Sequence, residues 1–280
     1  ETLGKPLSVV ISDGSVEKVS RFTYDSYGNL KTKIEEHNDD LETEIFYDET
    51  NTFPEKTIIY GVRNADGELE DIVTETGYDW ATGLKQWEKD ARGFVTRYEY
   101  DKLNRVIKVI LSDDDEDDSN NPYLEYIFDD AKNICEHYNE KRQKTTYRFD
   151  GLGRLTEVVK HTSLYDGEVK TSYHYDVLGR IDRVTDAVGN VTSYVYDGMN
   201  RVVKVIYPDD AYVTLEYNDA TNTVIVTDEV GGIVIEQKDW AGRLIHVQQY
   251  LTYQGVMENI YNWRFTYDSM GNTLQQIDPK

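Results

Sequence analysis

YHYDVLGRIDRV, residues 173–184, decides the fold of this chain, because the chain repeats it with variations along its whole length. Aligned on the residue that follows the aromatic, the pattern occurs eleven times, and successive copies lie 21 to 31 residues apart. Repetition near a fixed period is typical of stacked supersecondary units. The copies are aligned at Asp25, Asp48, Asp79, Asp101, Asp129, Asp150, Asp176, Asp197, Asn218, Asp239 and Asp268.

Each copy predicts a strand, a tight turn and a returning strand. Aromatic residues alternate with polar ones before the turn, as in Tyr173-His174-Tyr175, which places the rings on one face of a strand. The Asp can accept a hydrogen bond from a backbone N–H two residues later, and the Gly or Asn that follows tolerates positive φ. The predicted turn residues are Asp25, Gly28, Asp79, Gly83, Asp101, Asn104, Asp150, Gly153, Asp176, Gly179, Asp197, Asn200, Asp239, Gly242, Asp268 and Gly271.

The returning strand begins after the turn, as in Val202–Ile206. Its apolar residues lie three apart as well as two apart, which indicates either a β-bulge or a strand partly covered on both faces. A second turn, such as Asp186–Gly189, leads into the next copy. We therefore expect an all-β fold, a curved antiparallel ribbon with about 22 strands.

The repeats predict a single array over residues 1–280. Spacings longer than 21 residues predict loop insertions near 61–71, 112–122, 161–170 and 250–262. The alternative is a β-propeller, since two repeats span 42 residues, close to one four-stranded blade. Asp79-Trp80 and Asp239-Trp240 resemble the Trp-Asp pair of propeller repeats, but in reversed order.

Composition limits the possible partners. Asp and Glu number 53 against 30 Lys and Arg, and the net charge of -23 would repel nucleic acid and anionic membranes. The hydrophobic fraction of 39% and the 23 Tyr suit a wide, thin sheet better than a thick core. We expect no membrane insertion by this segment, because no stretch approaches 18 apolar residues. The start at Glu1, without a signal segment, predicts an interior fragment of a larger protein.

The pattern YxYDxxGRLxxV, present at Tyr147–Val158, Tyr173–Val184 and Tyr194–Val205, resembles the RHS or YD-repeat family. The copies at Asp48 and Asn218 lack its Gly-Arg part. The resemblance implies a β-ribbon that spirals into a hollow shell, as in bacterial insecticidal toxin complexes, polymorphic RHS toxins and teneurins. It also implies a secreted or cell-surface parent protein, with the remaining repeats, the core of that parent and a polypeptide cargo as partners.

Catalytic motifs are not recognisable in the sequence. The histidines His37, His137, His161, His174 and His246 are scattered singly, and none forms a catalytic motif with Ser or Cys. Cys135 is the one cysteine and cannot form an internal disulfide. We expect no enzymatic activity, no cofactor and no metal site.

The acidic run Asp113–Asp118 fails the EF-hand pattern, because Asp118 stands where Gly is needed and Leu124 where the bidentate Glu is needed. We expect a solvated insertion there, with adventitious calcium binding left open.

The expected function is that of a non-catalytic wall segment in a shell that encloses and shields a toxin or another polypeptide. The net charge would favour a basic, unfolded cargo if much of it faces inward. The alternative is a cell-surface adhesion or glycan-binding module. Trp87 and Trp263 are the speculative glycan contacts, because they lie outside the turn pattern. Open sheet edges predict possible edge-to-edge self-association.

Overall fold

The computed structural model describes residues 4–12, 17–36, 41–112, 120–162, 167–253, 256–268 and 271–278. These residues form 23 β-strands and no α-helix, which confirms the all-β prediction. Each of the eleven repeats contributes one strand before its aligned residue and one after it, and β1 (Ser8–Ser12) precedes the first repeat. The chain divides into two compact units, Glu1–Asp130 with Cys135–Thr145, and Ala131–Ile134 with Thr146–Lys280.

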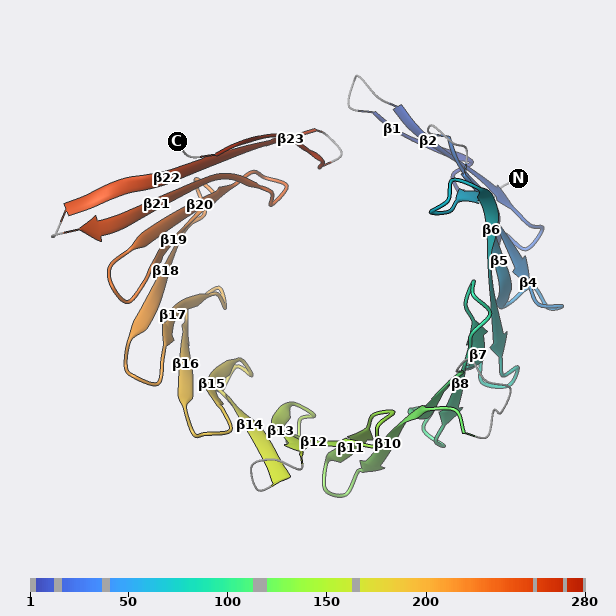
Figure 1. The fold of residues 1–280 in the computed structure, drawn as a ribbon, viewed down its shortest axis with the longest axis horizontal. Helices are drawn as coiled ribbons and strands as arrows, with labels where there is room; N and C mark the ends of the chain where they lie inside the picture. Colours follow the sequence, from blue (N-terminus) through green and yellow to red (C-terminus); the bar gives the residue numbers. More distant parts are fainter. Residues whose placement is uncertain are drawn as a thin grey trace. The chain divides into compact units, whose positions relative to one another are not determined.

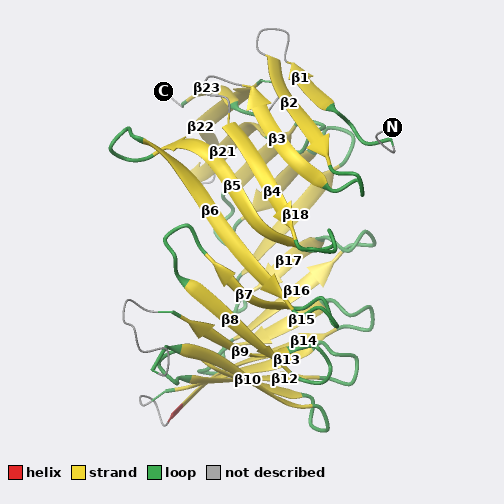
Figure 2. Ribbon diagram, turned by 90° about the vertical axis from the view of Figure 1, so that its right-hand side faces the viewer, coloured by secondary structure: helices red, strands yellow, loops and turns green. Residues whose placement is uncertain are grey.

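The first unit is an antiparallel meander. Each strand from β1 to β10 pairs with the next strand along the chain. Neighbouring strands such as β4, β5 and β6 lie side by side and are joined by short turns (Figure 2). The strands are β2 (Glu17–Tyr24), β3 (Leu30–Glu36), β4 (Leu41–Tyr47), β5 (Pro54–Arg63), β6 (Leu69–Tyr78), β7 (Lys85–Lys89), β8 (Val95–Tyr100), β9 (Val106–Leu111) and β10 (Tyr123–Asp129).

The second unit repeats this arrangement. Each strand from β13 to β23 pairs antiparallel with the next, and successive strands turn steadily, so the ribbon of this unit curves (Figure 1). By the bounds of the units, β11 (Ile134–Tyr138) lies mainly in the first unit and β12 (Lys144–Phe149) mainly in the second. The further strands of the second unit are β13 (Leu155–His161), β14 (Glu168–Tyr175), β15 (Ile181–Thr185), β16 (Val191–Tyr196), β17 (Val202–Ile206), β18 (Tyr212–Asn218), β19 (Thr223–Thr227), β20 (Ile233–Lys238), β21 (Leu244–Tyr253), β22 (Val256–Tyr267) and β23 (Thr273–Ile277).

This uninterrupted pairing excludes the propeller alternative for both units. A propeller blade ends after four strands, and the next blade starts a separate sheet. Here strand pairing continues without a break from β1 to β10 and again from β13 to β23.

A β-bulge marks the start of most returning strands and explains their irregular apolar spacing. In the β16–β17 hairpin, Val195 pairs with Lys204, whereas Tyr196 pairs with Val202, so Val203 has no partner. The same register shift occurs one residue before the aligned Asp in seven further hairpins, β2–β3, β4–β5, β6–β7, β8–β9, β14–β15, β20–β21 and β22–β23. The structure thus shows the bulge, and it also shows both faces of returning strands such as β17 half-buried, so the two possibilities occur together.

The sheet has almost no buried core. Val159, 4% exposed, is the one buried apolar side chain among the described residues. Strand register places side chains of adjacent strands on a common face: Tyr173 pairs with Val184, and Val184 pairs with Thr192, so these three share one face. Each unit is therefore stabilised by contacts between adjacent strands, with both faces partly open to solvent.

Two of the expected insertions extend hairpins. Residues 61–71 include the ends of β5 and β6, joined by the turn at Asn64–Glu68, and residues 250–262 extend β21 and β22. Of the other two, residues 113–119 and 163–166 lie outside the described residues, and with them the acidic run.

Candidate functional site

The turns after the aromatic strands, here called YD turns, share one geometry. In the turn Asp176–Arg180, the Asp176 N–H donates to the Arg180 carbonyl at 2.9 Å, and the Gly179 N–H donates to the Asp176 carbonyl at 3.0 Å. Asp176 Oδ1 accepts the N–H groups of Leu178 at 2.9 Å and Arg180 at 3.0 Å. Gly179 has φ +82°, a conformation that costs glycine little.

The predicted turn residues adopt this conformation in both units. Positive φ occurs at Gly28, Gly83, Asn104, Gly153, Gly179, Asn200, Gly242 and Gly271. Among these eight turns, the one at Asp79 is one residue longer than the rest. Its Gly83 N–H donates to the Asp79 carbonyl at 2.7 Å, and Asp79 Oδ1 accepts the Thr82 hydroxyl.

An arginine joins each Gly-Arg turn to the following repeat. Arg180 Nε donates to Asp176 Oδ2 at 2.7 Å, within its own turn. Its guanidinium carbon lies 4.5 Å from the centre of the Tyr196 ring, and its second terminal nitrogen donates to Asn200 Oδ1 at 2.9 Å. The planar cation therefore holds an acid, a ring and the neighbouring turn at once.

The tyrosine of the following repeat completes the contact. Tyr196 donates its hydroxyl to the carbonyl of Ile181, the residue directly after Arg180, at 2.5 Å. We call this set of Asp, Arg and the next repeat's Tyr the repeat clasp. Tyr175, Tyr217 and Tyr267 donate in the same way to the carbonyls of Leu155, Val202 and Leu244, under Arg154, Arg201 and Arg243.

Repeats without every member of the clasp use substitutes. In the first unit, Arg105 lies 4.1 Å from the centre of the Phe128 ring, which has no hydroxyl, and forms an additional ion pair with Asp130 at 2.6 Å. Asn29 takes the place of arginine in its turn. It donates to Asp25 Oδ2 at 3.1 Å and to the Asn51 carbonyl of the next turn at 2.6 Å.

The clasp keeps its acids charged. The backbone N–H of Arg180 lowers the pKa of Asp176 most, burial opposes this, and the guanidinium of Arg180 lowers the pKa further. Asp101, Asp150, Asp197 and Asp239 have lowered pKa values for the same reasons. Each of these carboxylates therefore acts as the anion of a turn and holds its own counter-ion.

The two tryptophans predicted as glycan contacts both have packing partners. The Trp87 indole lies against Gly77 on the paired strand, where an added Cβ would come within 2.1 Å of Trp87 Nε1. Trp263 stacks on Tyr261, with ring centres 5.4 Å apart. Trp80 and Trp240, which directly follow a turn Asp, are more exposed, at 58% and 87%. Glycan contact by Trp87 and Trp263 stays a prediction.

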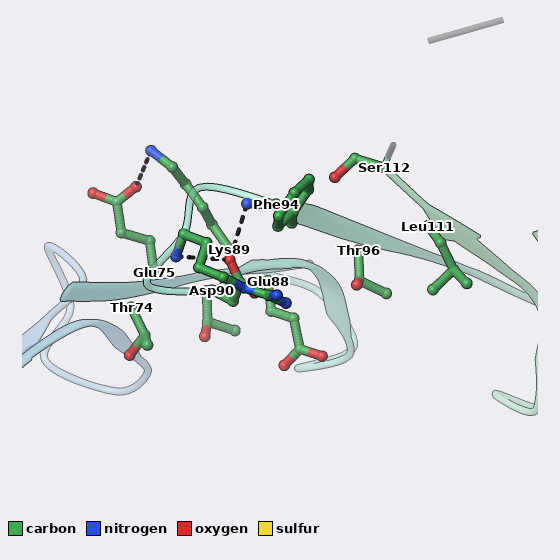
Figure 3. Close-up of a pocket in the computed structure, with 11 residues that line it drawn as sticks. Thr74, Glu75, Glu88, Lys89, Asp90, Phe94, Thr96, Leu111 and Ser112 are labelled. Atoms are coloured by element: carbon green, nitrogen blue, oxygen red, sulfur yellow. Dashed lines mark hydrogen bonds and ion pairs between the residues drawn. The ribbon is translucent and has the colours of Figure 1, made fainter. Parts of the chain in front are cut away.

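An open pocket of about 620 Å³ lies over β6, β7 and β8 in the first unit (Figure 3). Its charged groups hold one another: Glu75 pairs with Lys89 at 3.3 Å, and Asp90 pairs with Arg92 at 3.0 Å. Nearby, burial and a hydrogen bond to Glu88 raise the pKa of Tyr98 to about 12. The charged side chains that line the pocket thus pair with one another and link β6 to β7.

The scattered histidines stay apart in the described residues. His161 contacts the Thr146 hydroxyl, His174 contacts Asp182, and His246 contacts Asn262. Burial raises the pKa of the Cys135 thiol, which keeps it protonated. No cluster of three His, Cys, Asp or Glu residues suited to a metal ion occurs in the described part of the chain. That part also contains no helix with the length and apolar composition of a membrane span.

The link from arginine to the next tyrosine was missed in the sequence. Each of Arg105, Arg154, Arg180, Arg201 and Arg243 is followed in the next repeat by an aromatic residue directly before the aligned position. Aromatics stand there after repeats without arginine as well, as at Tyr47 and Tyr100, so the sequence pattern alone gave only a weak signal. The contacts show that the repeat is a unit of contact between neighbours as well as a unit of folding.

Solved structures share this fold. A crystal structure of TcdB2-TccC3 is 14% identical with a TM-score of 0.57, over 97% of this chain and 18% of that chain. A TcdB2-TccC3 structure without its hypervariable C-terminal region is 12% identical (TM-score 0.54; 93% and 18%). TcdB2-TccC3-Cdc42 is 12% identical (TM-score 0.53; 99% and 19%). The chain thus spans less than a fifth of these proteins, and at such identities the likeness shows the fold alone.

No curated protein matches the chain. The family model of the RHS repeat matches residues 175–212, which contain two aligned copies of the YD pattern and the clasp of Arg180 with Tyr196. Residues 175–212 thus match the RHS repeat, and the resemblance predicted from the sequence is confirmed.

Proposed function

We propose that this chain is part of a wall that encloses and shields a polypeptide inside a larger secreted or cell-surface protein, and that it has no enzymatic activity of its own. The observation that carries the proposal is the one-layer sheet. Only Val159 is a buried apolar residue in the described part of the chain, so the repeats form a surface that separates two sides.

The comparisons support this proposal through the fold. The similar proteins are about five times as long as this chain, and the fold is also present in a TcdB2-TccC3 structure without its hypervariable C-terminal region. We propose that the parent of this chain likewise combines further repeats and a core with a separate cargo. The net charge of -23 favours a basic cargo at short range.

Proteolysis of the parent protein tests enclosure. A basic, protease-sensitive polypeptide placed after the repeats of the parent should stay intact when protease is added. The same polypeptide fused to the isolated 280-residue chain should be cut, because one wall segment cannot surround it. Complete cleavage in the folded parent would contradict enclosure. An acidic polypeptide of equal length separates the two parts of the proposal, since equal protection would remove only the preference for basic cargo.

One observation favours the alternative of glycan binding. Tyr261 stacks on Trp263 and is 43% exposed on the sheet, so an aromatic surface is open to a ligand there. A glycan array decides this alternative. Sugar binding that is lost in Trp263→Ala and kept in Trp87→Leu would favour it, and an array without bound sugar would remove it.

A further inference from the structure

One edge of the second unit carries exposed apolar side chains on four of its YD turns, those at Asp150, Asp176, Asp197 and Asp239. Leu152, Val177, Leu178, Met199 and Trp240 stand one or two residues after a turn Asp, and Leu178 and Met199 are each 69% exposed. Because successive strands pair antiparallel, every YD turn of the unit lies at the same end of the strands. We call these five residues the turn rim.

The turn rim carries little net charge in a strongly acidic protein. The turn acids pair within their own turns, Asp176 with Arg180 at 2.6 Å and Asp197 with Arg201 at 2.8 Å. Asp219, the acid at the centre of a neighbouring YD turn, pairs with the same Arg201 at 2.5 Å. The four turn acids beside the rim side chains thus each have an arginine partner, whereas Asp219 shares Arg201 with Asp197 and adds one uncompensated negative charge.

The opposite edge of the unit differs. Its turns carry exposed Val188 and Val230 at the matching position, 82% and 77% exposed. Acids accompany them there: Glu229 stands beside Val230, and Asp209-Asp210 occupy the turn between. Two copies of this edge would therefore repel each other more strongly than two copies of the turn rim.

The spacing of the rim identifies its partner. One YD turn follows another after two strands, which is about 10 Å at the usual strand separation. A partner that covers several rim side chains at once must present apolar groups at the same interval. The turn rim of a second copy has this interval, because it consists of the same YD turns. A two-fold axis would place Leu178 and Met199 of one copy against the same residues of the other.

We infer that the turn rim of the second unit binds the turn rim of a second copy of this chain in a two-fold dimer. Five side chains of on the order of 100 Å² each would bury roughly 500 Å² per copy, below the roughly 800 Å² of a standard interface. The dimer is therefore weak and forms reversibly with concentration. It differs from pairing of open strand edges, which uses backbone hydrogen bonds.

Analytical ultracentrifugation of the 280-residue chain over a concentration series tests the inference. The rim variant is Leu178→Glu/Met199→Glu, and the control at the opposite edge is Val188→Glu/Val230→Glu. The four positions match, because each residue donates its backbone N–H to Oδ1 of its turn Asp and exposes its side chain. Leu178→Gln/Met199→Gln is a neutral version of the rim variant, and circular dichroism checks the fold of each.

The native chain should form dimers whose dissociation constant rises about tenfold or more in the rim variant, and by a smaller factor in the neutral version. The control should keep the native value. A native chain that stays monomeric at every concentration would overturn the inference. Equal loss in the rim variant and the control would also overturn it, as would a dimer that the rim variant retains, which would assign association to the open strand edges.

Discussion

Arg180 and Tyr196 hold each other across two repeats. The guanidinium carbon lies 4.5 Å from the centre of the ring, and the Tyr196 hydroxyl donates to the carbonyl of Ile181, directly after the arginine. The same guanidinium is paired with Asp176. The Arg180 side chain, which belongs to the turn of one repeat, thus also contacts the repeat that follows.

Replacing Arg180 by lysine should destabilise the second unit by about 1 kcal/mol, because lysine keeps the charge but loses the planar contact with the ring and the forked hydrogen bonds. Arg183→Lys is the control, since Arg183 is an exposed arginine on the adjacent strand. Urea denaturation followed by circular dichroism measures both variants. Equal stability of the two would contradict the role given to the clasp.

Tyr196→Phe should cost about 1 kcal/mol, because the Ile181 carbonyl loses its donor while the ring stays in place. Tyr194, two residues earlier on the same face of β16, offers the matched comparison. Tyr194→Phe should change the free energy of unfolding by less than about 0.5 kcal/mol. If both variants lose the same stability, the hydroxyl of Tyr196 has no special part.

Gly179→Ala should destabilise the chain by about 1–2 kcal/mol, since alanine resists the left-handed conformation at φ +82°. Gly198→Ala should be neutral or slightly stabilising, because Gly198 has no positive φ and open space around its Cα. Gly179→Asn should recover part of the loss, as asparagine occupies the equivalent position 200 with φ +65°. Thermal unfolding gives the order of the three.

Acid should weaken the turns. The pKa of Asp176 is lower in the folded chain than in the unfolded chain, so its contribution to stability is complete above the unfolded pKa of about 3.9. That contribution is lost as pH falls from there through the folded pKa. Asp176→Asn should therefore lower stability at pH 7 and reduce the slope of stability against pH below pH 4. An unchanged slope would show that the arginine and amide contacts do not favour the charged form.

The sequence predicted the architecture of the hairpins because their turns are encoded locally. An acidic side chain, two central residues and a Gly or Asn such as Gly179 lie within five positions, and the alternation of aromatics extends only a few residues further. Strand number and the positions of reversals could therefore be derived without any information on tertiary contacts.

What could not be derived depends on distances between repeats. Whether Val203 is a bulge residue depends on the register between β17 and β16. The contact of Arg180 with Tyr196 depends on how the two hairpins lie next to each other in space. Trp87 was predicted as a glycan contact because it lies outside the turn pattern, and its packing partner could not be derived from that pattern. Its contact is with Gly77, which belongs to the paired strand and is ten residues away.

The thinness of the sheet has a mechanical consequence. Each hairpin is fastened mainly to the hairpins before and after it, so a pull applied at one end of the second unit would open the ribbon hairpin by hairpin, as a zipper opens. For the same reason, adding or removing one whole repeat of about 21 residues would lengthen or shorten such a ribbon and preserve the strand pairing of the neighbouring repeats.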